Sequence, residues 1–239
     1  MGLLNAVVDL SHHNTVTDFS EAANAGVVGV IHKATQGTDF VDATYDAHRA
    51  RAKDAGLLWG AYHFARTDDV DRQVDHFLSV ANCGPGELLV LDFEPNATEG
   101  SMTLPEAERF VTMVRDRTGR FPGLYSGQSF LREVVGGNVT TILSKCWLWI
   151  ARYGPALPLV PAAWQGFTLW QYTDGNAGMQ PHQVPGIGRC DRDKFNGDER
   201  SLRRLWGHGS LDPHARPAAP VGVAPPVGGR PPKRSRRAK

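Results

Sequence analysis

Short apolar runs alternate with helix-like segments along most of the chain. The apolar runs are rich in β-branched and aromatic residues, a composition typical of buried strands. We therefore predict strands over residues 6–11, 27–35, 57–65, 88–91, 121–126, 146–153, 167–173 and 189–195. We predict helices over residues 19–25, 43–55, 70–80, 103–118 and 129–135.

The order of these elements determines the predicted fold class. Strands that alternate with helices form a parallel sheet, and eight of them suggest a closed (β/α) barrel. The last three predicted strands are joined by loops rich in proline and glycine instead of good helices. We therefore predict an α/β protein: an irregular (β/α) barrel with about five β/α units followed by three strands with few helices.

The formal net charge of +1 conceals two oppositely charged parts. Residues 208–239 contain seven Lys or Arg, one acid and seven of the 16 prolines, whereas residues 1–207 contain 19 basic and 24 acidic residues. A segment with so few large apolar side chains cannot form a core. We predict a barrel domain over residues 1–207 and a disordered, Pro/Gly-rich basic tail over residues 208–239.

The residue composition and the lengths of the apolar runs exclude several classes of protein. A chain with 41% hydrophobic residues can bury a full core, and no window approaches about 18 consecutive apolar residues, so we expect no membrane span. The first residues lack the basic region of a signal peptide, so we expect synthesis in the cytoplasm and action after release or export by another route. Three cysteines without metal-type spacing argue against a disulfide framework and a zinc cluster.

Polar and aromatic side chains occupy the predicted strand ends. In parallel barrels the loops after the strands converge on one mouth, where active sites lie. Acids and aromatic rings together are what a carbohydrate site needs for its chemistry and for stacking against sugar rings. The collection comprises Asp9, Ser11, Lys33, Tyr62, His63, Asp92, Glu94, Tyr125, Arg152, Tyr153, Gln171, Tyr172, Asp191 and Asp193.

Asp92 and Glu94 follow a buried strand as an acidic pair. Residues two apart on a strand face the same side, with Cα atoms roughly 6.6 Å apart, so their charges repel. Solvation alone would explain an isolated pair, but Asp9 and Asp191 at other strand ends favour a catalytic one. The spacing fits both the retaining and the inverting arrangement of carboxyl groups, and substrate assistance is a third option.

Eight motifs follow one another at a spacing that suits a barrel: VDLSHHN, IHKATQGTDFVD, GAYHF, VLDFEP, GLYSG, LWIARY, LWQYTDG and CDRDKFNG. Together they resemble the family 25 glycoside hydrolases, the Chalaropsis-type lysozymes or N-acetylmuramidases. The resemblance implies a barrel enzyme that hydrolyses the β-1,4 bond between N-acetylmuramic acid and N-acetylglucosamine in bacterial peptidoglycan. Because a lysin without a signal peptide needs help to cross the membrane, we favour a phage endolysin within this family.

The resemblance also implies catalytic roles for four acids. Glu94 matches the general acid, and Asp92 matches its partner, which steadies either a covalent species or the acetamido group of the substrate. Asp9 and Asp191 match the other two acids of the cleft floor.

The expected binding residues come from the resemblance and from the strand ends. Three positions, His32, Gln36 and Phe93, depart from the family pattern, and none of them is one of the four acids. The departures put the details of sugar binding in question more than the reaction. The expected substrate-binding residues are Tyr62 and Gln171 by motif, and Lys33, Tyr125 and Tyr153 by position.

Two other functions compete with the muramidase. A non-catalytic wall-binding module on the same fold would have no need of a repelling carboxylate pair. A metal-dependent barrel hydrolase would use His12 and His13 with Asp9, but adjacent strand residues face opposite sides. We therefore expect no metal, no cofactor, a monomer, and peptidoglycan as the partner. The tail is expected either to bind polyanions of the cell envelope or only to aid solubility, and nothing indicates dedicated nucleic-acid binding.

Overall fold

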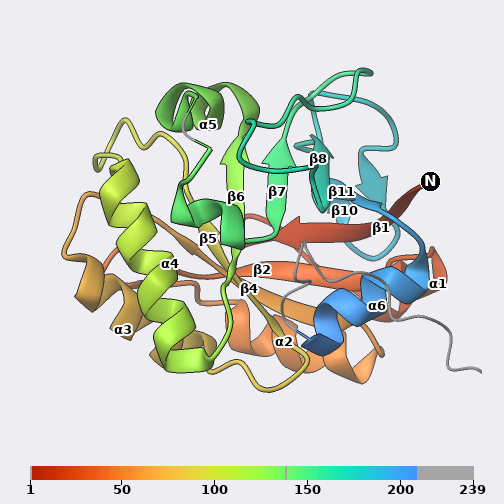
Figure 1. Cartoon of the computed structure of the whole chain (residues 1–239). Helices are drawn as coiled ribbons and strands as arrows, with labels where there is room; N and C mark the ends of the chain where they lie inside the picture. The colour runs from red at the N-terminus through yellow and green to blue at the C-terminus, as the bar shows by residue number, and fades with distance from the viewer. Residues whose placement is uncertain (1, 138, 209–239) are drawn as a thin grey trace, which may run out of the picture.

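The structure, a computed structural model, describes residues 2–137 and 139–208 (Figure 1). Its strands are β1 (Leu3–Leu10), β2 (Gly29–Gln36), β3 (Phe40–Val41), β4 (Leu58–Phe64), β5 (Leu88–Asp92), β6 (Gly123–Gly127), β7 (Leu148–Ala151), β8 (Leu169–Thr173), β9 (Gln183–Val184), β10 (Gly188–Arg189) and β11 (Asp191–Asn196). Its helices are α1 (Phe19–Asn24), α2 (Tyr45–Asp54), α3 (Val70–Ala81), α4 (Leu104–Thr118), α5 (Gln128–Val135), the 3-10 helix η1 (Ile142–Lys145) and α6 (Glu199–His208).

Eight of these strands close into a barrel. Their order around the ring is β1, β11, β8, β7, β6, β5, β4, β2, and pairing of β1 with β2 closes it. A helix follows each of β1, β2, β4, β5 and β6 before the next strand of the ring, whereas β7 and β8 have no helix after them. The predicted irregular barrel of five β/α units and three further strands is therefore confirmed.

The last barrel strand differs from the prediction in its direction. β11 runs antiparallel to both β8 and β1, whereas the other neighbours in the ring are parallel. The chain between β8 and β11 contains the β9–β10 hairpin instead of a crossover helix, so it turns back at the same end of the barrel. As a result the first residue of β11, rather than its last, lies at the mouth, where Asp191 pairs with Asp9 at the end of β1.

The helices cover the outside of the barrel, with α2, α3 and α4 flanking the parallel strands in Figure 1. Their ends carry the predicted signals. The Glu106 carboxylate accepts from the Thr103 backbone N–H at the start of α4, and Gly119 ends that helix at φ +78°. Within the described residues, no helix is both long enough and apolar enough to cross a membrane.

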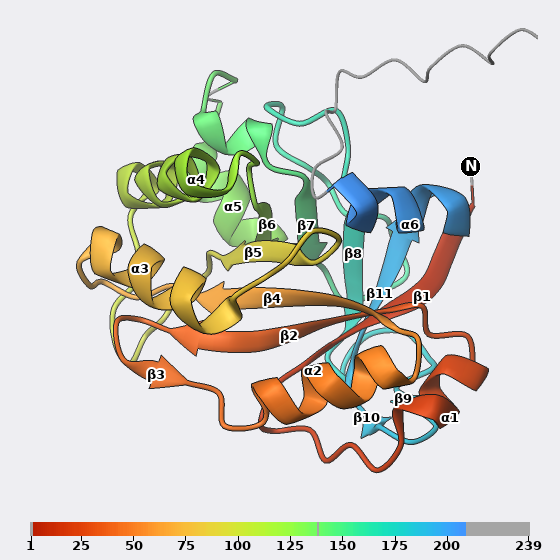
Figure 2. The ribbon, with the colours of Figure 1, turned by 90° about the horizontal axis from the view of Figure 1, so that it is seen from below.

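The last helix, α6, was not predicted, and it closes the barrel at the end opposite the mouth. Leu202, Leu205 and Trp206 are buried with the side chains that fill the barrel interior. The Trp206 indole donates to the backbone oxygen of Trp59 at 2.8 Å and lies against Gly29, where a Cβ would meet its ring at 3.0 Å. Figure 2 shows α6 beside the start of β1. The described barrel therefore extends to His208, one residue past the predicted boundary, and residues 209–239 of the predicted tail lie outside the described part.

Candidate active site

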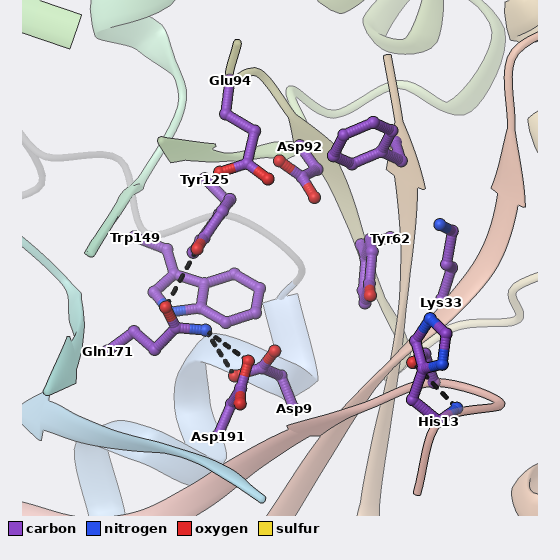
Figure 3. Close-up of a pocket in the computed structure, with 12 residues that line it drawn as sticks. Asp9, His13, Lys33, Tyr62, Asp92, Glu94, Tyr125, Trp149, Gln171 and Asp191 are labelled. Atoms are coloured by element: carbon purple, nitrogen blue, oxygen red, sulfur yellow. Dashed lines mark hydrogen bonds between the residues drawn. The ribbon is translucent and has the colours of Figure 1, made fainter. Parts of the chain in front are cut away.

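The mouth of the barrel contains a pocket that brings together the predicted acids (Figure 3). Asp92 and Glu94 lie on one side of it and Asp9 and Asp191 on the other. The lining residues are Asp9, Ser11, His13, Lys33, Tyr62, Phe64, Asp92, Glu94, Tyr125, Trp149, Gln171 and Asp191. Residues from β1, β2, β4, β5, β6, β7, β8 and β11 reach this one space because the ring brings their ends together.

Gln171 on β8 connects the aromatic wall of the pocket to two of the acids. Its Oε1 accepts from the hydroxyls of Tyr125 at 2.9 Å and Tyr153 at 3.0 Å. Its Nε2 donates to Asp9 at 3.0 Å and Asp191 at 3.1 Å. Because two phenol donors meet the amide oxygen, the amide nitrogen must face the carboxylates, and its two N–H groups supply one to each. Gln171 is thus held in one orientation by four partners.

Asp92 and Glu94 share a buried environment with a single nearby lysine. Burial is the main cause that raises the pKa of each carboxyl, and the charge of Glu94 raises the pKa of Asp92 further. The Lys33 ammonium opposes this rise for both acids, and Asp92 is the charge that acts on it most strongly. Because two buried like charges are unfavourable, the pair retains a proton and titrates as a unit. Lys33 favours the ionised form of Asp92 in particular.

Lys33 is held over the pocket by neutral groups. Its Nζ donates to Gln36 Oε1 at 2.6 Å and lies 4.9 Å from the centre of the Phe64 ring. Burial lowers the pKa of Lys33, and Asp92 counteracts this effect. Gln36, one of the departures from the family pattern, is therefore an uncharged partner. The acids that act on the ammonium through their charge are, in order of effect, Asp92, Asp42, Glu99 and Glu94.

Asp191 provides a test of how these buried acids affect stability. Burial, with help from the charge of Asp174, raises the pKa of Asp191 from 3.8 to about 6. A carboxyl that binds its proton more tightly when folded stabilises the protein at acid pH, and this contribution is lost as the pH rises from 3.8 to about 6. Asp191→Asn removes the titration, so we expect it to be more stable than the parent at about pH 7, by up to about 3 kcal/mol, with the difference vanishing near about pH 4.

Urea unfolding of parent and variant at both pH values measures this difference. The exposed Asp54→Asn on α2 is the matched control and should show no such pH-dependent gain. A gain for Asp191→Asn that is equal at both pH values would contradict the assignment of the effect to the titration of this carboxyl.

The structure brings eight of the nine predicted site residues into the pocket. The ninth, Tyr153, lines an adjoining hollow that shares Glu94 and Tyr125 with the pocket, and it reaches the pocket network through Gln171. The predicted site residues are Asp9, Lys33, Tyr62, Asp92, Glu94, Tyr125, Tyr153, Gln171 and Asp191.

Other strand-end candidates lie elsewhere. His63 faces the helix layer, where it bonds Thr35 and Gln73, because it alternates with Tyr62 along β4. Tyr172 faces outward for the same reason, next to Gln171, and bonds Asn5. Asp193 is fully buried beneath the pocket.

Three lining residues are absent from the predicted substrate site: His13, Phe64 and Trp149. Alternation could have identified Phe64 but not Trp149. Phe64 lies two residues after Tyr62 on β4, and Trp149 lies two residues before Ala151 on β7 in a run whose inward face the pattern alone does not reveal.

The predicted placement of His12 and His13 on opposite faces of a strand is wrong. His12 and His13 lie in a turn after β1, not in the strand, and their ring centres are 4.0 Å apart instead of on opposite faces. They nevertheless have different surroundings: His12 Nδ1 lies 2.9 Å from Asp42 Oδ2, whereas His13 lines the pocket. Within residues 2–137 and 139–208, no group of three or more His, Cys, Asp or Glu is placed to hold a metal ion.

The related sequences found by comparison with known proteins include a lysozyme and a muramidase. Lysozyme M1 from Streptomyces globisporus is 30% identical over 217 residues, which cover 83% of this chain and 70% of that protein. The N,O-diacetylmuramidase of Chalaropsis sp is 26% identical over 185 residues, covering 71% of this chain and 88% of that protein.

Solved structures agree with the sequences. The bacterial lysozyme from Streptomyces coelicolor matches with a TM-score of 0.76 at 28% identity, covering 88% of this chain and 100% of that one. The muramidase from Acremonium alcalophilum matches with a TM-score of 0.73 at 30% identity, covering 84% and 97%. The sequence model described as glycosyl hydrolases family 25 matches residues 8–179, which is most of the barrel. The chain belongs to glycosyl hydrolases family 25.

Proposed function

We propose that this protein is a muramidase that hydrolyses the β-1,4 bond between N-acetylmuramic acid and N-acetylglucosamine in bacterial peptidoglycan, with Glu94 as the general acid. One observation carries the assignment of roles: an acidic pair, the buried Asp92 and the partly buried Glu94, faces two further acids across a pocket with aromatic walls. Glycoside hydrolysis needs one carboxyl group that holds a proton and another that is ionised beside the sugar ring.

The roles within the pair follow from position. Asp92 is only 6% exposed, and burial and the charge of Glu94 raise its pKa, so its ionised form depends on the Lys33 ammonium, which opposes that rise. Glu94 stands on the loop after β5, where the pocket meets the adjoining hollow lined by Tyr125 and Tyr153. A proton on Glu94 would lie between the pocket and the hollow, which supports its transfer to the leaving oxygen of a glycan that spans both. Asp92 would then support the positive charge that develops on the ring.

The pocket walls suit a sugar that carries hydroxyl and acetamido groups. Burial raises the pKa of Tyr62 and Tyr125 well above the ordinary value of 10.0, so both hydroxyls keep their protons. Tyr125 donates its proton to Gln171, and Tyr62 can donate to a sugar. The Trp149 ring lies against Tyr125, with ring centres 4.7 Å apart and planes inclined by 66°. Such rings give a sugar an apolar surface, while the fixed Gln171 amide and the acids bind its polar edge.

Digestion of purified peptidoglycan tests this function directly. The products are reduced and hydrolysed, and the sugar that carries the new reducing end is identified. We expect N-acetylmuramic acid. N-acetylglucosamine at that position would assign the opposite bond, and the absence of new reducing ends under conditions where the protein binds the wall would favour the non-catalytic binding module.

The same digestion in the presence of EDTA tests the metal-dependent alternative. Carboxyl, amide and aromatic groups line the pocket, and general acid catalysis by a carboxyl needs no metal. We expect the rate to be unchanged by the chelator. A chelator-sensitive enzyme that zinc restores would instead be a metal-dependent hydrolase.

We further propose that the basic tail attaches the enzyme to polyanions of the cell envelope. Residues 230–239 contain six Lys or Arg. Removal of residues 209–239 should leave turnover of soluble muropeptide oligomers unchanged, because α6 stays whole, but should weaken binding to whole cells. The difference should shrink with added salt, since charges are screened over about 8 Å at physiological ionic strength.

A full-length control in which the six basic residues are replaced by Gln separates charge from length. It should bind cells as weakly as the truncated protein. Equal binding of parent, control and truncated protein at low salt would leave the tail only a solubilising role.

A further inference from the structure

Asp193 is a fifth carboxyl group at the centre of the barrel, and the reaction described above does not use it. It lies on β11 two residues after Asp191 and points to the same inward side. Across the sheet it pairs with Val7 on β1 and with Gln171 on β8. Its side chain is 0% exposed and lies beneath the pocket instead of lining it. A carboxyl buried this deeply is costly unless every oxygen has a partner.

One oxygen of Asp193 holds a wall of the pocket in place. Asp193 Oδ1 accepts from the Trp149 indole N–H at 2.7 Å. The indole has only this one polar hydrogen, so the bond fixes the rotation of the ring. Trp149 is itself 2% exposed and packs against Tyr125, and its ring lines the pocket.

The other oxygen of Asp193 lacks a donor. Among the described residues, no N–H or O–H group bonds Asp193 Oδ2. The two amide hydrogens of Gln171 already go to Asp9 and Asp191. Arg192, the preceding residue on β11, donates to the backbone oxygen of Gln183 and acts on Asp193 through its charge without bonding it. An ionised Asp193 would therefore leave a buried oxygen without compensation.

Asp9 is the diagonal neighbour of Asp193 across the β1–β11 pair, because it pairs with Asp191, and a hydrogen bond between the two carboxyls contributes to the pKa of each. Two carboxylates repel, but a carboxyl and a carboxylate bond each other through one proton. Burial raises the pKa of Asp9 and Asp193, and each is raised further by the charge of Asp191. Tyr62 on β4 also faces Asp9 and stays protonated.

We propose that Asp193 is a positioning residue that holds the Trp149 ring against the sugar site and shares one proton with Asp9. The shared proton leaves the Asp9–Asp193 pair with a single negative charge. Together with Asp191, the floor of the pocket then presents two negative charges to a sugar instead of three. The positioning role rests on the proposed function, whereas the shared proton does not depend on it.

Two substitutions of similar size separate the role of the proton from the role of packing. In Asp193→Asn the amide oxygen can accept from Trp149 and the amide N–H can donate to Asp9, which replaces the shared proton by a permanent one. In Asp193→Leu both contacts are lost. We expect the Leu variant to lose about 10- to 100-fold in kcat, because the Trp149 ring would no longer be held in position. The Asn variant should recover most of that loss.

A measurement without substrate decides whether the proton is shared. At neutral pH the infrared spectrum of the parent should contain the carbonyl stretch of a protonated carboxyl that is absent from Asp193→Asn. In ¹⁵N-labelled protein the Trp149 indole N–H resonance should stay near its parent position in the Asn variant. If the protonated-carboxyl bands of parent and Asn variant are identical, Asp193 is ionised and the proposal is wrong.

These outcomes are independent of the test of function. If Asp193→Leu does not fold, the infrared comparison of the parent with the Asn variant still gives the answer. If peptidoglycan is not hydrolysed but the carboxyl band disappears in the Asn variant, the shared proton stands and the muramidase assignment fails. An Asn variant that loses as much kcat as the Leu variant would show that Asp193 acts through its charge instead.

Discussion

Glu94→Gln should lower the rate of peptidoglycan hydrolysis by about two to four orders of magnitude, the usual contribution of a general acid. The amide keeps the size and shape of the side chain but has no proton to transfer to the leaving oxygen. Binding to peptidoglycan should persist, because the aromatic walls and the Gln171 network are untouched. The limb of the pH–rate profile that reports ionisation of the acid should disappear together with the fast reaction.

The measurement needs a matched control and a test of folding. Glu199→Gln makes the same change on α6, at the closed end of the barrel, and should have the parent rate. Circular dichroism establishes that both variants are folded. A folded Glu94→Gln protein within a few fold of the parent rate would end the claim that this residue is the acid.

Asp92→Asn is expected to lower the rate by about two to three orders of magnitude, through loss of the charge that supports the transition state. Its second effect distinguishes it from Glu94→Gln. Burial and the charge of Asp191 raise the pKa of Glu94. An ionised Asp92 is a further negative charge beside it, so removing Asp92 should lower the pKa of the acid. The limb that reports this acid should therefore move to lower pH while remaining visible.

Rates across pH on the same substrate measure both effects of Asp92→Asn. The control is Asp68→Asn, which changes an acid that pairs with Arg66 away from the pocket. A slow Asp92→Asn enzyme whose limb stays at the parent pH would mean that Asp92 does not tune the acid, and that its importance lies elsewhere.

The sequence predicted the elements of this fold better than their directions. The apolar runs and the glycine and threonine signals located every barrel strand and the five helices of the β/α units, because burial and capping are local properties. The direction of β11 is not local: the alternation of Arg192 and Asp193 is the same whichever way the strand runs. It depends on the hairpin before it, whose short strands carry little signal.

The helix α6 could have been found. Leu202, Leu205 and Trp206 have helical spacing, and Asp198 precedes the helix as a capping residue that accepts from the Ser201 backbone N–H. Because the basic, proline-rich tail begins directly after it, the predicted domain boundary fell within this helix, and the helix was not predicted. Trp149 and Asp193 could not be assigned from sequence, because their roles depend on one hydrogen bond across the barrel between β7 and β11.

The position of α6 also decides how this enzyme can be attached to something else. Gly207 lies beside Gly84 and Arg120, in the loops that join the bottoms of the strands, whereas Glu94 and Asp9 open on the other side of the barrel. A module or a solid support joined after His208 is therefore fixed to the back of the molecule. Anchoring at this point would leave the catalytic face pointing away from the anchor and accessible to a long glycan strand, whereas a tag on a loop around the mouth would stand in its way.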